Sequence, residues 1–190
     1  MAHADSLPND VIDAVASQIG AEAGKALGAA VLQRKAMEMT ESFSVWALEA
    51  DSVTKPNGDL SQLARQTGRW HHQIKIDGRA ESFARSMPLG PDAANWSVRE
   101  IFESAVAQRI DDAIEWIDSN VKGDPLVRLL IVPAYHVHAF WLIEGDTSNI
   151  VVADMPQSFA KLQTGKLYCA KEFLEALSQE QHIIGINVKQ

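Results

Sequence analysis

The alternation of side chains along residues 126–155 is the strongest pattern in the chain. In an extended segment from Tyr135 to Ile143, odd-numbered residues fall on one face and even-numbered residues on the other. Both faces are largely apolar, which is typical of a strand covered on both sides. We therefore expect this strand to lie at the centre of an antiparallel sheet.

The flanking residues predict the partners of this strand. A second apolar run, Val127–Val132, precedes it and is closed by Pro133, which cannot donate a ladder hydrogen bond. Residues 144–149 are dense in turn formers, and Ile150–Asp154 then resumes a strand pattern. These features predict a hairpin of Tyr135–Ile143 with Ile150–Asp154, joined by a loop of about six residues.

Apolar residues at helical spacing predict an N-terminal helix over residues 9–39. Gly20, Gly24 and Gly28 recur at a spacing of four within it, which indicates one flat face where another helix packs closely. That face serves either packing against the chain's own sheet or self-association. Residues 41–53 fit either a helix or a strand, and we favour a strand from Phe43.

The middle of the chain predicts a second hairpin and an amphipathic helix. Trp70–Ile76 and Arg79–Met87 alternate on either side of Asp77-Gly78, a strong two-residue turn signal. Ser97 and Glu100 have capping-box spacing and open a predicted helix over residues 97–121.

After Pro156 the chain predicts a loop, a short helix over 171–178 and a terminal strand over 182–188. The expected fold class is α+β, with an antiparallel sheet of about five strands packed against the 97–121 helix. We divide the chain into an N-terminal helical segment, 1–58, and an α+β part, 59–190, which together form one compact domain.

Composition excludes several classes of function. The formal net charge is −8 and no Lys/Arg cluster occurs, so we expect neither a nucleic-acid partner nor membrane attraction through basic residues. The single cysteine, Cys169, excludes an internal disulfide, and the first residues lack a signal-peptide pattern. We therefore expect a soluble, cytoplasmic protein. The phosphate-loop, dinucleotide, zincin and hydrolase-elbow motifs are all absent from the sequence.

The histidines are the best candidates for chemistry. His136 and His138 lie about 7 Å apart along one face of the predicted strand, a spacing that suits two ligands of zinc or another divalent transition metal. His72 (or its neighbour His71) and Asp154 can complete the site if the two hairpins are adjacent. The alternative is a pair of strand histidines that hydrogen-bond to the backbone.

Two resemblances follow from these residues. The order of His138, a turn and Asp154 resembles the hairpin of papain-like cysteine peptidases, in which the histidine is the base and the later acid orients it. In that family the nucleophilic cysteine precedes the histidine, whereas Cys169 follows both residues.

The second resemblance is broader. A hairpin that begins at Trp70, a long helix, the segment Arg128–Ala134 and the segment Ala139–Leu142 together resemble a bacterial domain family without an assigned activity. The resemblance extends over residues 68–177 and implies a stand-alone bacterial domain.

Two hypotheses of function remain. The first is a non-catalytic interaction or accessory protein that binds another protein or self-associates through Gly20, Gly24 and Gly28. Trp96, in a loop bounded by Pro and Gly, is a second candidate contact. The alternative is a metal-dependent or small-molecule-binding enzyme that uses the histidine cluster.

Overall fold

The chain folds into two compact units. The computed structural model describes residues 2–26, 37–53, 59–90, 95–103 and 105–187. Unit 1 comprises residues 1–3, 46–67 and 112–190, and unit 2 comprises residues 4–45 and 68–111. Each unit therefore combines segments from both sides of residue 58.

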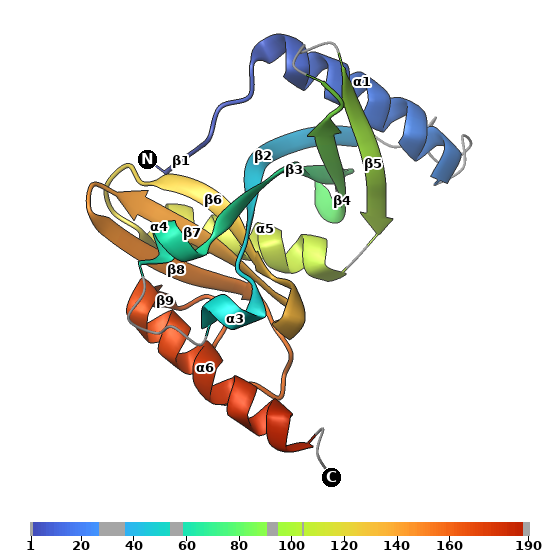
Figure 1. Cartoon of the computed structure of the whole chain (residues 1–190). Helices are drawn as coiled ribbons and strands as arrows, with labels where there is room; N and C mark the ends of the chain where they lie inside the picture. Colours follow the sequence, from blue (N-terminus) through green and yellow to red (C-terminus); the bar gives the residue numbers. More distant parts are fainter. Residues whose placement is uncertain (1, 27–36, 54–58, 91–94, 104, 188–190) are drawn as a thin grey trace. The chain divides into compact units, whose positions relative to one another are not determined.

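Unit 2 is a layer of antiparallel strands with one long helix. Its strands follow in the order β5 (Trp96–Glu103), β4 (Arg79–Pro88), β3 (Arg65–Ile76) and β2 (Met37–Ala47), with the last residues of β2 and the first of β3 assigned to unit 1. Helix α1 (Asn9–Ala26) lies beside these strands (Figure 1).

One face of α1 forms the core of unit 2. Val11, Val15 and Ile19 recur every four residues and are fully buried, because that spacing brings them onto one side of the helix. They pack with Trp70, Ile74 and other residues of the sheet. Burial of each such side chain stabilises the fold by roughly 1.5–3 kcal/mol, so this stripe holds α1 on the strands.

The hairpin predicted at Asp77-Gly78 is confirmed. Both residues have positive φ, 50° and 78°, as a tight two-residue hairpin turn requires. β3 and β4 pair antiparallel on either side of it, with Ile76 opposite Arg79. Trp70, His72, Ile74 and Ile76, which we placed on one strand face, are all buried.

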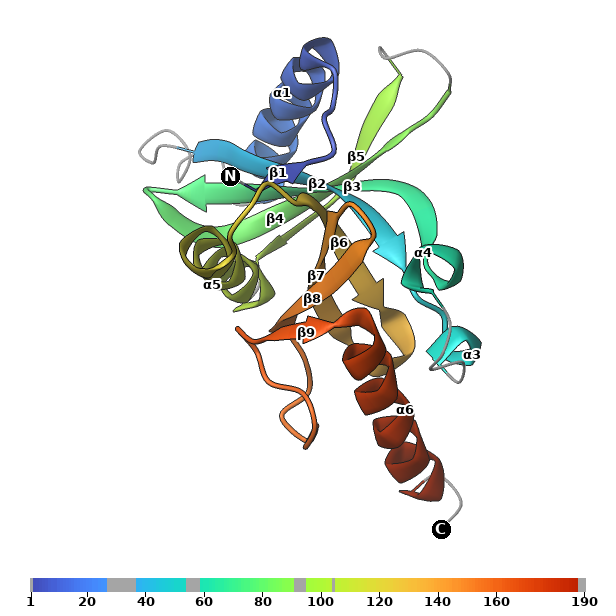
Figure 2. The same ribbon diagram turned by 90° about the vertical axis from the view of Figure 1, so that its left-hand side faces the viewer.

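Unit 1 contains the central hairpin of the chain. Its strands follow in the order β6 (Leu126–Val132), β7 (Val137–Glu144), β8 (Thr147–Asp154) and β9 (Leu167–Cys169), and β1 (His3–Ala4) pairs with β6 (Figure 2). A 3-10 turn, η1 (Pro133–Tyr135), joins β6 to β7. The short helices α3 (Ala50–Val53) and α4 (Leu60–Leu63) also belong to this unit.

Helix α6 (Ala170–Asn187) supplies one side of the unit 1 core. Phe173, Leu174 and Leu177 are fully buried and belong to one cluster with Trp141 and Ile150 of the β7–β8 hairpin. Phe140 and Leu142, on the opposite face of β7, are buried as well. The expectation that this strand is covered on both sides is therefore confirmed.

The β7–β8 pairing is confirmed, although its turn is tighter than expected. β8 begins at Thr147, and only Gly145 and Asp146 separate the paired residues Glu144 and Thr147. Gly145 has a φ of 57°, which a glycine adopts without strain. The predicted six-residue loop is therefore wrong, because Glu144 on one side and residues 147–149 on the other join the ladder.

The helix predicted over residues 97–121 is wrong in its first third. Residues Trp96–Glu103 form β5, which pairs with β4, and helix α5 (Ala105–Asn120) begins only afterwards. A capping box contributes about 1 kcal/mol. Pairing with β4 satisfies backbone groups along one side of the segment, and Trp96 and Val98 pack on the core of unit 2. Together these contacts outweigh the local signal.

The other corrections concern segment ends. The helix predicted over residues 9–39 ends at Ala26 as far as it is described, residues 27–36 lie outside the described part, and β2 already begins at Met37. The predicted terminal strand 182–188 is wrong, because α6 continues through Asn187. The nine described strands also exceed the sheet of about five that we expected.

α and β elements both occur, and the sheet is mostly antiparallel, as in the pairings β3–β4, β4–β5, β6–β7, β7–β8 and β8–β9. Within the described residues, none of the helices combines the length and the apolar character needed to cross a membrane.

Candidate functional site

Two of the four predicted metal ligands lie next to each other. His138 of β7 and Asp154 of β8 are directly opposite in the ladder. His138 Nδ1 lies 3.6 Å from Asp154 Oδ2, and both side chains are mostly buried. This distance is beyond a normal hydrogen bond but within reach of an ion pair when the imidazole is protonated.

His136 does not share a strand face with His138, contrary to our expectation. It is the residue that follows the 3-10 turn, with φ 52° and ψ 39°, and its side chain is exposed. Pro133 opens that turn, so β7 begins only at Val137. Histidine is one of the few residues enriched in this left-handed conformation, which explains its place at the corner.

His72 belongs to unit 2, where it bridges two serines. Its Nδ1 lies 2.8 Å from Ser42 Oγ and its Nε2 lies 2.6 Å from Ser86 Oγ, so both ring nitrogens are engaged. The side chain is fully buried, and this burial lowers the pKa of His72 to about 4. A neutral imidazole with two hydroxyl partners is a structural group of the strand layer.

The ligand set for a metal therefore reduces to His138 and Asp154. Over residues 2–26, 37–53, 59–90, 95–103 and 105–187, no group of three or more His, Cys, Asp or Glu side chains gathers around a common point. Zinc sites in proteins use three or four protein ligands. Two of the four predicted zinc ligands are next to each other, and the zinc site itself remains a prediction.

Cys169 has a structural role at the start of α6. Its backbone N–H donates to Glu172 Oε2 at 3.0 Å, and the Glu172 N–H points at Cys169 Sγ at 3.5 Å, which is a capping box with a thiol in place of a hydroxyl. Cys169 pairs with Asn149 of β8, five residues from Asp154. That interval spans about 16 Å, so the thiol is beyond hydrogen-bond reach of Asp154.

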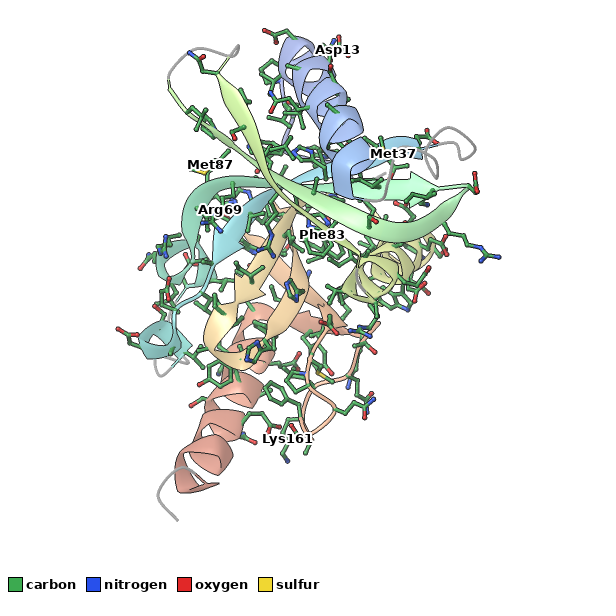
Figure 3. All side chains as sticks on the ribbon, turned by 90° about the vertical axis from the view of Figure 1, so that its right-hand side faces the viewer. Asp13, Met37, Arg69, Phe83, Met87 and Lys161 are labelled. Atoms are coloured by element: carbon green, nitrogen blue, oxygen red, sulfur yellow. The ribbon has the colours of Figure 1, made fainter. Side chains whose placement is uncertain are left out.

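The glycine face of α1 is only partly described. A Cβ on Gly20 would lie 3.9 Å from Met37 Cε, so this turn of α1 already contacts β2 of its own unit (Figure 3). Gly24 lies within α1, and nothing is described of what surrounds it. Gly28 lies outside the described residues. At Gly20 the geometry favours internal packing over self-association.

Trp96 is the first residue of β5 and not a loop residue. Its half-buried ring packs against the core of unit 2. The Gln18 side chain of α1 donates to the Trp96 carbonyl at 2.9 Å and accepts from the Val98 N–H at 3.1 Å. One amide thus satisfies two backbone groups of β5, as a neighbouring strand would.

An open cleft of about 440 Å³ lies in unit 1. One wall comes from the exposed side of α6, and the other from β9 and the loop before it, where Lys161 is labelled in Figure 3. The residues that line it are Lys161, Lys166, Leu167, Tyr168, Glu172, Glu175, Ala176 and Gln179.

The loop that forms one wall is held by specific hydrogen bonds. Glu180 is buried on α6, and its Oε1 accepts from the N–H groups of Ala160 and Lys161 at 2.8 and 3.2 Å. The Tyr168 hydroxyl accepts from the Gln163 N–H at 2.8 Å. A carboxylate that accepts backbone hydrogen bonds in a buried setting is a strong anchor, so this wall is preorganised.

No motif identified this cleft in the sequence. Its two lysines come from a segment that we predicted to be a loop. Three of its α6 residues, Glu172, Glu175 and Gln179, lie on the polar face of the helix, as exposed residues of any amphipathic helix do. The spacing of Glu172, Glu175 and Gln179 marks one helix face. Which part of the chain lies opposite that face depends on the fold, and the spacing of residues along the helix does not reveal it.

The chain matches no family model, no curated protein and no solved structure in these three comparisons.

Proposed function

We propose that this chain is a non-catalytic interaction domain that binds another protein at the cleft between β9 and α6. The observation that carries the proposal is the preorganised cleft, with a leucine exposed at its edge. Leu167 is 42% exposed, although it lies in a strand next to a folded core. A single exposed leucine is common on protein surfaces, but here it lies at the edge of a preorganised cleft with charged side chains around it, as in the apolar centre and polar rim of a protein contact surface.

The shape and chemistry of the cleft favour a protein partner over a small molecule. Sites for small ligands enclose most of the ligand and are lined mainly by apolar groups. This cleft is open, and charged or amide side chains form five of its eight lining residues. Open, hydrated walls suit recognition of a surface segment more than proton transfer, which enzymes perform in sites that exclude water.

The experiment is site-specific photo-crosslinking in the native host. A photoreactive amino acid replaces Leu167 in one protein and Leu89 in a matched control, because Leu89 is also an exposed leucine, 58% exposed, but lies outside the cleft. We expect a discrete adduct from position 167 and none of the same mass from position 89. An adduct at twice the mass of the chain identifies a second copy as the partner.

A blocking variant makes the test specific to the cleft. Gln179→Trp fills an exposed lining position, and Gln157→Trp introduces the same side chain at an exposed position outside the cleft. The adduct should disappear with Gln179→Trp and persist with Gln157→Trp. Equal adducts from positions 167 and 89, or an adduct unaffected by Gln179→Trp, would overturn the proposal.

A second candidate is a metal-dependent enzyme, and the contact between His138 and Asp154 favours it. Elemental analysis of protein purified without chelator or affinity tag tests it, with His138→Ala alongside. Near-stoichiometric zinc, iron or manganese that is lost in the variant would support this candidate. Wild-type protein that carries no metal and does not retain added zinc would rule it out.

A further inference from the structure

The charged groups that line the cleft differ in how far they are already neutralised. The Glu172 carboxylate accepts the Cys169 N–H at the start of α6. Glu175 Oε1 lies 3.8 Å from the ammonium of Lys171, which is outside the cleft. Both carboxylates in the cleft therefore have a partner within the chain.

The two lysines of the cleft are more available. The Lys166 ammonium lies 5.1 Å from the centre of the Tyr168 ring, a cation–π contact, and within the described residues it takes part in no hydrogen bond or ion pair. Within the described part of the chain, the Lys161 ammonium takes part in no hydrogen bond or ion pair. The cleft thus offers two cationic donors, although the chain has a net charge of −8.

Apolar surface accompanies these cations. Leu167 is exposed, and Ala176 and the side of Tyr168 complete the lining between the charged groups. A ligand that satisfies the whole lining therefore presents carboxylates towards Lys161 and Lys166 and an apolar side chain towards Leu167. Charge-assisted hydrogen bonds from ammonium to carboxylate are stronger than neutral ones.

We infer that the cleft binds an acidic peptide segment of its partner, with alternating carboxylate and apolar side chains. This inference rests on the proposed function, because it names the chemistry of the partner at the same cleft. A nucleic acid is less suited, because two lysines neutralise few phosphates. Exposed charge pairs are weak and screened, so binding should decrease as salt increases.

The experiment uses fluorescein-labelled hexapeptides and fluorescence anisotropy with the full chain. One peptide alternates Asp and Leu, a second alternates Lys and Leu, a third alternates Ser and Leu, and a ten-residue oligothymidylate serves as the nucleic-acid probe. We expect the Asp/Leu peptide to bind at least about tenfold more tightly than the other three probes at low salt. Stronger binding of the Lys/Leu peptide or of the oligonucleotide would overturn the inference.

Charge reversal locates the effect. Lys161→Glu/Lys166→Glu should weaken binding of the Asp/Leu peptide by about tenfold or more. The control Lys122→Glu/Arg79→Glu changes the net charge by the same −4 at two exposed positions outside the cleft, and it should leave the affinity within about twofold. Equal losses in both double variants would show that only long-range charge matters, which contradicts the inference.

The two proposals fail separately. A cleft-dependent crosslink at position 167 that survives Lys161→Glu/Lys166→Glu would keep the interaction domain and reject the acidic segment. Absence of that crosslink would reject both.

Discussion

Acidification should destabilise the chain through one buried histidine, His72. Its imidazole is neutral in the fold, where it lies between the hydroxyls of Ser42 and Ser86. Burial lowers its pKa from 6.5 to about 4. The unfolded chain therefore binds a proton at a higher pH than the folded chain does.

The sign and size of the effect follow from that shift. A depressed histidine pKa contributes stability that is fully present above pH 6.5 and is lost as the pH falls from 6.5 to 4. The complete pKa shift corresponds to a loss of about 3 kcal/mol in the free energy of unfolding, and at pH 5 this loss already reaches about 2 kcal/mol. This is a large part of the stability of an ordinary domain.

The assay is urea unfolding followed by tryptophan fluorescence at pH 7.5 and pH 5.0. His72→Gln replaces the imidazole with a group that does not titrate, and His136→Gln makes the same change at an exposed position. When the pH is lowered from 7.5 to 5.0, the free energy of unfolding of the wild type and of His136→Gln should decrease by about 2 kcal/mol more than that of His72→Gln. If all three proteins show the same pH dependence, the assignment to His72 is wrong.

Other predictions follow from single contacts. Glu180→Ala removes the acceptor of two loop N–H groups and should lower the free energy of unfolding by about 1–3 kcal/mol. We expect trypsin to cleave after Lys161 faster in this variant, and an unchanged cleavage rate would contradict the prediction. Gly123→Ala should lower the melting temperature more than Gly145→Ala. Both glycines have positive φ, but only at Gly123 would the added Cβ displace the Glu144 carboxylate, which accepts the Asp124 N–H; the reverse order would refute this account. Gln18→Ala leaves two backbone groups of β5 without their partner and should lower the free energy of unfolding by about 1 kcal/mol. Because uncovered edge strands pair with other chains, the variant should also associate as its concentration rises. Light scattering identical to that of the wild type would argue against this prediction.

The parts of the fold that were predictable are those with local causes. Asp77-Gly78 marks a tight turn because both residues tolerate positive φ, and the flanking alternation then sets which side of β3 is buried. The β7–β8 hairpin was predicted for the same reason, and it brings His138 opposite Asp154. In both cases neighbours in the sequence are also neighbours in the ladder.

The parts that were missed depend on partners far away in the sequence. Residues 97–103 carry a helix-start signal, yet β4 pairs with all of them except Arg99. The pattern at 182–188 also fits a helix, because three apolar residues at alternate positions, Ile184, Ile186 and Val188, do not distinguish a short strand from a helix that continues to Asn187. Sequence periodicity does not tell which partner strand is available.

The candidate sites show the same division. The proximity of His138 and Asp154 was predictable, whereas the left-handed conformation of His136 depends on the 3-10 turn before it. The serine partners of His72 come from β2 and β4, far from it in the sequence. The cleft combines a loop with a helix face, and hydrogen bonds from two loop N–H groups to the Glu180 carboxylate fix their distance.

The crosslinking yield at position 167, compared between wild type and Gln179→Trp, tests the central claim most directly. A partner protein at the cleft predicts one discrete adduct that is lost when Trp occupies position 179 and retained when Trp occupies position 157. A yield at position 167 no higher than at position 89 would show that the exposed leucine of β9 is an ordinary surface residue and would contradict the account.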